Sequence, residues 1–468
     1  MQPAPTFQFT LRSYQEMGLS WLYFLGRARL GGCLADDMGL GKTIQVLAYL
    51  DLKRFESEKG KRFRSLLICP RSLLEYWAQE AKKCAPQLKV FILRSPEISR
   101  LESLFEHYDL LLISYGLTRL HVSELQKYPF DLLALDEAQL IKNSGAQITM
   151  AVNQLQGVQR LAISGTPIEN HMGEFLSLFE FLNPGFTNPM LLKTLNVQPE
   201  DQSTMLTQFL KGIRPLVLRR LKNEVAKELP EKLDQVVILP MEESQEAIYS
   251  SLKTYYQEQL KKQTSELFYE KSFFLEGLLR LRQVSCHPSL LENKMRSEVV
   301  SNKFEFLIDK LKILVSSNHK AIVFSQFTSL LKLFRPMLDE LEIPHEYLDG
   351  QSQDRMDIVL RFQENPEIPV LLAGMKTGGL GLNLTAADYC FILDPWWNPA
   401  IEQQAVDRLH RIGQDKIVNI YRMVSQHTVE EKMLLLKEKK QKIADQLMAA
   451  DHSFLEQLNY EDFQFLFH

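Results

Sequence analysis

Residues 36–43 have the types and the spacing that bind a phosphate group. They read Asp-Asp-Met-Gly-Leu-Gly-Lys-Thr and stand between the short apolar run 32–35 and a segment with helical spacing. A loop from strand to helix directs backbone N–H groups and the helix N-terminus at one point, which suits an anion. Lys42 would place a charge beside the β- and γ-phosphates of a nucleotide, and Thr43 would offer its hydroxyl to Mg²⁺.

One position of this loop departs from the usual phosphate-binding pattern. The pattern opens with a glycine at the position where this chain has Asp36. The alternative interpretation is a glycine-rich turn from strand to helix that binds no ligand. The acidic residues that follow a later apolar run favour the nucleotide site over this alternative.

Those acidic residues are two adjacent carboxylates that could perform hydrolysis. The apolar run 130–135 ends in Asp136 and Glu137. A carboxylate at the end of a buried strand can hold Mg²⁺ through water, which suits Asp136. Glu137 could orient and deprotonate an attacking water. The alternative is a solvated acidic turn, which the phosphate-binding pattern in the same half of the chain disfavours.

A parallel sheet is the element that would position these residues. Short runs that are apolar throughout alternate with helical patterns in the first half of the chain, at 65–69, 109–113, 130–135 and 160–163. This alternation is typical of a parallel sheet covered by helices, which binds ligands at the carboxyl ends of its strands. The pattern restarts in the second half at 320–324, 370–373, 389–393 and 417–424. The second half has no phosphate-binding lysine of its own, because Lys376 precedes the glycines there.

A helix in the second half carries two arginines that could act on a phosphate. Asn398 can cap this helix and Pro399 suits its first turn, and helical spacing predicts that it continues to Ile412. On such a helix Gln404, Arg408 and Arg411 share one strip beside an apolar face. Guanidinium groups there could stabilise charge on a transferring phosphoryl group. The alternative is an exposed arginine pair on a surface helix.

Length and composition bound the class of protein. A chain of 468 residues is too long for one core, so two or three domains are expected. The net charge of −4 means that any nucleic-acid surface must be local. The five cysteines lack metal or disulfide spacing, which predicts reduced and mostly buried thiols. No apolar run reaches transmembrane length and no signal peptide is visible.

Together these motifs resemble the SWI/SNF-type helicase-like ATPases of superfamily two, from Leu11 to about Met448. The most specific strings are Asp-Pro-Trp-Trp-Asn-Pro at 394–399 and Arg-Leu-His-Arg-Ile-Gly-Gln at 408–414. The other motifs lie at 11–15, 36–43, 66–77, 135–139, 163–170, 320–327 and 377–385. The compact insertions are similar to those of prokaryotic members, which implies a cytoplasmic, nucleoid-associated protein; a eukaryotic member would be nuclear.

The resemblance implies an α/β fold of two RecA-like parallel-sheet lobes with helical protrusions, and ATP with Mg²⁺ as cofactors. The expected first lobe is 1–230, with a protrusion at about 186–215. The expected second lobe is 231–450, with a protrusion at about 242–300, followed by a C-terminal tail at 451–468. No accessory module is visible, so a core cut from a longer protein is expected.

The resemblance also implies roles for individual residues. ATP would be bound by Arg12, Gln15, Asp37, Met38, Gly39, Leu40, Gly41, Lys42, Thr43 and Ile44, with Gln15 reading the adenine. Mg²⁺ would be held by Thr43 and Asp136. The catalytic residues would be Lys42, Asp136, Glu137 and the arginine fingers Arg408 and Arg411. Nucleotide state would be coupled to the lobes by Gln139, Ser164, Gly165, Thr166 and Gln404.

Family members move along double-stranded DNA without separating its strands, and they bind mainly its phosphate backbone. The implied DNA contacts are Arg71, Ser72, Ser114, Tyr115, Ser325, Gln326, Thr377, Gly378, Asn383, Trp397 and Asn398. The implied partners are double-stranded DNA with little sequence preference, a DNA-bound protein to be remodelled, and accessory domains outside this chain. Two alternatives stay open: a strand-separating DNA or RNA helicase, and a weakly hydrolysing, ATP-switched nucleic-acid-binding module.

Two positions depart from the family's usual residues. Many members have histidine where this chain has Gln139, and glutamine can still form hydrogen bonds. The run Leu-Arg-Gln-Val-Ser-Cys-His-Pro at 281–288 is a looser match than the other motifs. Neither departure removes a group that the proposed hydrolysis requires.

Overall fold

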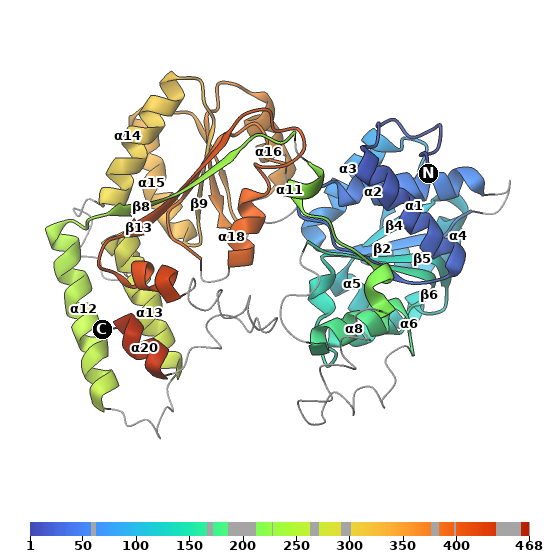
Figure 1. Ribbon diagram of the computed structural model, residues 1–468, viewed down its shortest axis with the longest axis horizontal. Helices are drawn as coiled ribbons and strands as arrows, with labels where there is room; N and C mark the ends of the chain where they lie inside the picture. The colour runs from blue at the N-terminus through green and yellow to red at the C-terminus, as the bar shows by residue number, and fades with distance from the viewer. Residues whose placement is uncertain are drawn as a thin grey trace. The chain divides into compact units, whose positions relative to one another are not determined.

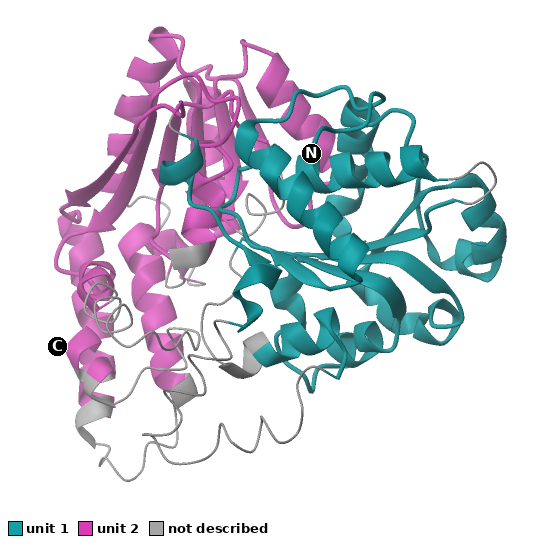
Figure 2. Cartoon of the chain, turned by 45° about the vertical axis from the view of Figure 1, so that its right-hand side comes forward, with its two compact units in different colours: residues 1–227 teal, residues 228–468 magenta. Residues whose placement is uncertain are grey.

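The computed structural model describes residues 1–57, 62–165, 172–185, 212–226, 228–262, 271–291, 301–375, 383–396, 399–436 and 460–467. The chain divides into two compact units, residues 1–227 and 228–468 (Figure 2). Each unit is built on its own parallel sheet with helices against it, so the predicted α/β fold with two lobes is confirmed. Among the described residues, no helix has the length and apolar character needed to span a membrane.

The first unit is built on a seven-stranded sheet in the order β3-β4-β2-β5-β6-β1-β7, in which every pairing is parallel. The strands are β1 (Gly32–Leu34), β2 (Ser65–Cys69), β3 (Val90–Ile92), β4 (Leu110–Ser114), β5 (Pro129–Asp136), β6 (Gln156–Ile163) and β7 (Val217–Leu218). Leu66 and Ile68 of β2 belong to one hydrophobic cluster, and Leu67 and Cys69 to another. Alternate residues of a strand face opposite sides, so a sheet covered on both faces requires the continuous apolar runs seen in the sequence.

Helices on both faces of this sheet complete the first unit (Figure 1). They are α1 (Ser13–Ala28), α2 (Lys42–Glu56), α3 (Leu74–Cys84), α4 (Leu101–His107), α5 (Tyr115–Leu120), α6 (Val122–Leu125), α7 (Gln147–Asn153), α8 (Met172–Leu182) and α11 (Lys222–Val225). Helix α2 packs between α1 and α3. The start of α2 therefore lies against α1, which brings the segment around Gln15 to the predicted phosphate loop.

The second unit is built on a six-stranded parallel sheet in the order β10-β11-β9-β12-β13-β8. The strands are β8 (Lys232–Leu239), β9 (Ala321–Ser325), β10 (His345–Leu348), β11 (Val370–Gly374), β12 (Tyr389–Ile392) and β13 (Val418–Ser425). The apolar pattern of the sequence predicted β9, β11, β12 and β13 but missed the edge strands β8 and β10. In the first unit it likewise missed β3 and β7, which also lie at the edges. Edge strands are partly exposed, so they lack the continuous apolar run that identifies a central strand.

The helices of the second unit include a long pair apart from the sheet (Figure 1). The helices are α12 (Glu243–Lys262), α13 (Lys271–Cys286), α14 (Asn302–Ser316), α15 (Thr328–Glu340), α16 (Arg355–Glu364), α18 (Pro399–Val406) and α20 (Tyr460–Phe467). Helices α12 and α13 pack against each other within the range 242–300, where the sequence indicated helices. The protrusion expected at about 186–215 lies mostly outside the described residues.

The prediction of a C-terminal tail at 451–468 is wrong for its last residues. Helix α20 packs against α12, and Leu466 and Phe467 are fully buried. The ring of Phe467 lies 5.7 Å from that of Tyr256 and 6.0 Å from that of Phe274. The tail prediction failed because the apolar partners of this short helix are about two hundred residues away in the chain, so no local pattern indicates the contact.

Candidate active site

The predicted phosphate loop joins β1 to α2, and α2 begins at Lys42. Gly41 has a left-handed backbone, with φ of 77°, and a Cβ atom there would come within 2.5 Å of Gln15 Nε2. Glycine is therefore required for both reasons. The N-cap residue of α2 is Gly41, which has no side chain to cap the helix, and the N–H groups of a first helical turn are suited to an anion.

Asp36 is the residue that replaces the usual first glycine, and it forms a buried ion pair. Arg220 Nε donates to Asp36 Oδ1 at 2.8 Å, and Arg220 Nη2 donates to Asp36 Oδ2. The same Nη2 donates to Gln45 Oε1 at 2.8 Å, and Gln45 Nε2 donates to Asp36 Oδ2 at 3.2 Å. Asp36 is fully buried. The departure from the usual pattern therefore fixes the start of the loop to Arg220, which follows β7.

Lys42 and Gln15 both contact the backbone of the loop. Lys42 Nζ donates to the carbonyl oxygens of Asp36 at 2.6 Å and Asp37 at 3.2 Å. Gln15 is buried; its Oε1 accepts from Arg12 N at 3.0 Å, and its Nε2 donates to Leu40 O at 3.2 Å. Gln15 thus holds the loop, a contact that the sequence did not predict. Its role in reading adenine stays a prediction.

The two predicted catalytic carboxylates lie at the end of β5, which is separated from β1 in the sheet only by β6. Glu137 has a left-handed backbone, with φ of 52°. Gln139 Nε2 donates to Glu137 Oε2 at 2.5 Å, and Ser164 Oγ donates to Gln139 Oε1 at 3.0 Å. A line of hydrogen bonds therefore runs from the end of β6 to the proposed base. It joins Glu137 to two of the residues predicted to couple nucleotide state to the lobes.

The residues that could hold Mg²⁺ are suited to it. Burial raises the pKa of Asp136 to about 6, and the charge of Glu137 acts in the same direction. Trp77, the Glu137 N–H and Lys42 oppose this rise in pKa. Magnesium prefers oxygen ligands and is usually bound by one or two side chains together with nucleotide phosphates, which fits Asp136 and Thr43. The described residues contain no cluster of three or more His, Cys, Asp or Glu side chains placed to hold a metal.

The other described residues of the first unit that were predicted to bind ATP or couple its state lie on the same loop or next to it. Asp37 Oδ2 accepts from Lys222 N at 2.9 Å, and Leu40 is fully buried. A Cβ atom at Gly165 would lie 2.7 Å from Met38 Cγ, so the loop and the end of β6 are in close contact. Thr166 lies outside the described residues, and Gln404 belongs to the second unit.

The helix that was predicted to carry the two arginines ends earlier than expected. Helix α18 stops at Val406, so Arg408 and Arg411 do not share a helical strip with Gln404. Two carbonyl groups that a longer helix would use are taken by other segments. Leu384 N donates to Arg408 O at 3.1 Å, and Gln414 Nε2 donates to Leu409 O at 3.2 Å. The side chain of Arg408 is buried, and the role of both residues as arginine fingers stays a prediction.

The predicted DNA contacts differ in exposure. Arg71 and Asn383 are exposed, and Ser72 and Gln326 are half-buried. Ser114 Oγ accepts from Leu117 N at 3.3 Å and caps α5. Four more predicted contacts lie outside the described residues: Thr377, Gly378, Trp397 and Asn398.

The hydroxyl groups of two predicted DNA contacts, Tyr115 and Ser325, are paired inside the protein, and the role of both residues in DNA binding stays a prediction. Tyr115 is buried, and its hydroxyl donates to Asp136 O at 2.8 Å. Ser325 is fully buried, and its hydroxyl donates to Asp394 Oδ1. Buried polar groups take partners inside the protein, and these two have done so. The position of a residue at the end of a strand predicts at which edge of the sheet the residue lies, but not which way its side chain points.

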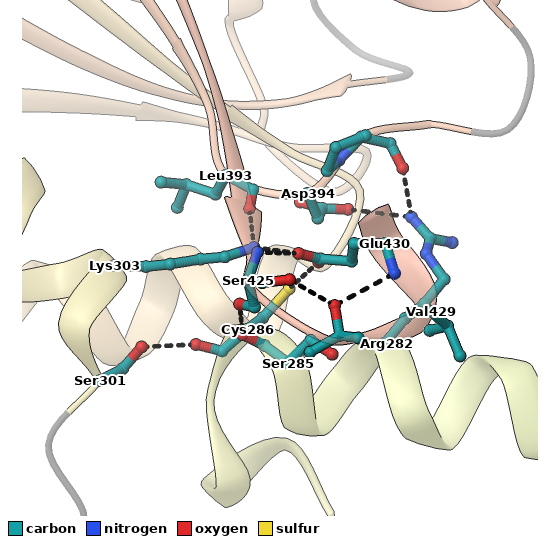
Figure 3. A network of polar contacts seen from close by, with 12 residues as sticks. Arg282, Ser285, Cys286, Ser301, Lys303, Leu393, Asp394, Ser425, Val429 and Glu430 are labelled. Carbon is teal, nitrogen blue, oxygen red and sulfur yellow. Dashed lines mark hydrogen bonds and ion pairs between the residues drawn. The ribbon is translucent and has the colours of Figure 1, made fainter. Parts of the chain in front are cut away.

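Asp394 belongs to a buried polar network in the second unit, shown in Figure 3. Arg282 Nη2 lies 3.7 Å from Asp394 Oδ2 and donates to Pro395 O at 2.7 Å. Lys303 Nζ donates to Glu430 Oε2 and to Leu393 O, both at 2.7 Å. The network ties α13 and α14 to the carboxyl end of β12. Removing one member would leave a buried charge without its partner.

Asp394 gives the second unit a specific pH dependence. Burial raises its pKa from 3.8 to about 6, outweighing the opposing charges of Arg282 and Lys303. Between these values the folded chain keeps a proton that the unfolded chain has released. The free energy of unfolding due to this carboxyl therefore falls by about 2–3 kcal/mol as pH rises from about 4 to 7. Urea unfolding of the wild type and Asp394→Asn across this range measures it: the wild-type value minus the variant value should fall as pH rises. A difference that stays constant would contradict the prediction.

Comparison with known proteins identifies the family. A model of the SNF2-related domain matches residues 14–290, and a model of the helicase conserved C-terminal domain matches residues 302–413. A solved Sulfolobus solfataricus SWI2/SNF2 ATPase core in complex with dsDNA is 30% identical with a TM-score of 0.47; the match covers 100% of this chain and 98% of that chain.

Several curated proteins are similar over almost the whole chain. The putative ATP-dependent helicase/translocase YwqA of Bacillus subtilis is 35% identical over 99% of this chain and 51% of its own length. An uncharacterized ATP-dependent helicase of Mycoplasma pneumoniae is 34% identical, over 98% of this chain and 44% of its own length. The TATA-binding protein-associated factor MOT1 of Saccharomyces cerevisiae is 31% identical, over 95% of this chain and 28% of its own length. The chain thus spans about half the length of the bacterial relatives or less. The SNF2-related domain model matches residues 14–290, which make up more than half of this chain. The chain therefore belongs to the SNF2 family of helicase-like ATPases of superfamily two.

Proposed function

We propose that the chain is a translocase that uses ATP hydrolysis to move along double-stranded DNA and to displace or remodel protein bound there. The observation that carries the hydrolytic part is the meeting of two groups of residues at one edge of the first sheet. The loop with Lys42 follows β1, and the line Ser164–Gln139–Glu137 joins the ends of β6 and β5. The loop and the candidate base thus follow β1 and β5, which have only β6 between them in the sheet, and this proximity supports the proposed hydrolysis.

The predicted site residues have defined tasks in the proposed hydrolysis. Lys42 and the N–H groups of α2 bind the phosphates, and Glu137 takes a proton from the attacking water. Gln139 holds Glu137 Oε2 through its amide N–H, which fixes the direction of the carboxylate. Magnesium, when bound through Thr43 and Asp136, offsets phosphate charge. Arg408 and Arg411 are assigned the stabilisation of charge on the transferring phosphoryl group.

Family membership and the relatives' names support duplex DNA as the track. One relative is named a helicase/translocase, and another a TATA-binding protein-associated factor. In the proposal, backbone contacts from both units grip the phosphates of one strand, so sequence preference is small. Such contacts release counterions, so affinity for DNA should fall steeply as salt concentration rises.

Steady-state ATP hydrolysis by the full chain tests the proposal, measured without nucleic acid and with duplex DNA, single-stranded DNA or RNA. A triplex-displacement assay and a strand-displacement assay run beside it. We expect duplex DNA to stimulate hydrolysis most, and the third strand to be displaced while the duplex stays paired. Lys42→Ala should abolish hydrolysis and displacement together.

Other outcomes would select the alternatives. Separation of duplex strands, with equal or stronger stimulation by single strands or RNA, would support a helicase and contradict the translocase. Very slow hydrolysis that no nucleic acid changes, with nucleotide-dependent binding of DNA, would support an ATP-switched binding module instead. Either result would overturn the proposal.

A further inference from the structure

Asp136 is held by two residues that the proposed reaction does not use. Trp77, on α3, donates its indole Nε1–H to Asp136 Oδ2 at 2.8 Å. Tyr115, the first residue of α5, donates its hydroxyl to the backbone oxygen of Asp136 at 2.8 Å. Both side chains are buried, with exposed fractions of 0% and 4%. One residue therefore holds the carboxylate, and the other holds the backbone that carries it.

These contacts determine how the carboxylate is presented. Asp136 Oδ1 accepts from the N–H of Glu137 at 2.9 Å, so each carboxylate oxygen accepts one hydrogen bond from a fixed donor. An ionised carboxylate has about four lone-pair sites, so both oxygens keep acceptor capacity for a further ligand. With a donor on each side, rotation of the carboxylate about its Cβ–Cγ bond is restricted. The group is therefore oriented before any metal binds.

The choice of partner for Trp77 is informative. A buried tryptophan needs an acceptor for its N–H, and a backbone carbonyl is sufficient for this. Trp21 of the same unit, which is half-buried, uses one, donating to Pro215 O at 2.8 Å. Trp77 instead donates to a carboxylate at the end of β5. Replacing a partner that orients a metal ligand in this way typically lowers metal affinity or activity by about 10–100-fold.

We propose that Trp77 and Tyr115 are positioning residues of the magnesium site: together they fix the side chain and the backbone of Asp136 so that the carboxylate is set for the metal. Neither residue touches the nucleotide or the metal in this proposal. It rests on the proposed function, because it concerns the metal of the proposed ATP hydrolysis. It adds two residues that the comparison of motifs did not assign to the metal site.

Equilibrium binding of a fluorescent ATP analogue to the full chain tests the proposal, in EDTA and during titration with MgCl2. Trp77→Phe removes the indole N–H and keeps an aromatic ring in the core. We expect it to raise the Mg²⁺ concentration at half-saturation about tenfold, with binding in EDTA unchanged. Hydrolysis by this variant should recover at high Mg²⁺. Trp21→Phe is the matched control and should shift neither value.

Tyr115→Phe is a second variant, because it removes one hydroxyl and leaves the core filled. We expect a smaller rise in the Mg²⁺ requirement, again with binding in EDTA unchanged. Thermal unfolding of each variant shows that it is folded. Equal Mg²⁺ requirements for Trp77→Phe, Trp21→Phe and the wild type would overturn the proposal, as would an equal loss of binding in EDTA and in MgCl2.

The two proposals fail in different ways. If the wild type binds the analogue equally well in EDTA and MgCl2 and also hydrolyses ATP without Mg²⁺, the magnesium assignment itself is wrong and the proposed hydrolysis falls with the positioning role. If the wild type responds to Mg²⁺ and Trp77→Phe and Tyr115→Phe respond as it does, only the positioning role falls. Asp136→Asn calibrates the assay, because it should remove most of the Mg²⁺-dependent gain in affinity.

Discussion

Replacement of Glu137 by glutamine is expected to stop ATP turnover and to leave ATP binding intact. The amide keeps the size of the side chain and can still form a hydrogen bond with Gln139, but it cannot accept the proton of the attacking water. A positioned general base contributes about 10²–10⁴-fold to rate, so kcat should fall within that range. Steady-state hydrolysis gives kcat, and equilibrium binding of a fluorescent ATP analogue gives affinity.

Glu124→Gln is the control for this substitution. Glu124 lies on α6 with a half-exposed side chain, where it pairs with Lys127. The same chemical change there should leave both kcat and ATP affinity unchanged. A Glu137→Gln variant that hydrolyses ATP at more than a tenth of the wild-type rate would remove Glu137 from the role of base. A loss of ATP binding equal to the loss of rate would instead place it in nucleotide binding.

Replacement of Arg220 by methionine is expected to destabilise the first unit strongly. Arg220 is buried and donates to Asp36, to Gln45 and to the backbone oxygen of Tyr14. Removing it leaves the carboxylate of Asp36 buried without its cation, which costs about 3–5 kcal/mol. Urea unfolding should show this loss in the first unit. Because Asp36 begins the phosphate loop, affinity for ATP should fall in the same variant.

The neighbouring arginine is a control for this prediction. Arg219 is exposed, so Arg219→Met makes the same chemical change one residue away. Its free energy of unfolding should lie within about 0.5 kcal/mol of the wild type, as is usual for surface substitutions. Equal stabilities of the Arg220→Met and Arg219→Met variants would mean that the buried ion pair contributes little to the first unit.

The sequence by itself determined the class of fold and the core of the candidate site. Central strands such as β2 and β9 were found because a strand buried on both faces must be apolar along its whole length. The loop at 36–43 was found because a phosphate site needs glycines, a lysine and a hydroxyl within a few residues. Asp136 and Glu137 were found because they directly follow a buried strand. All of these signals are local.

The tertiary structure alone decided which distant groups meet. Arg220 is 184 residues from Asp36, and Trp77 is 59 residues from Asp136. Tertiary contacts also decided three other features: the inward direction of Ser325, the end of α18 at Val406 and the packing of α20. Periodicity reports how one element is buried, because the spacing of side chains along it fixes which ones share a face. It does not report what packs against that face, because the partner is chosen by the fold of the whole chain.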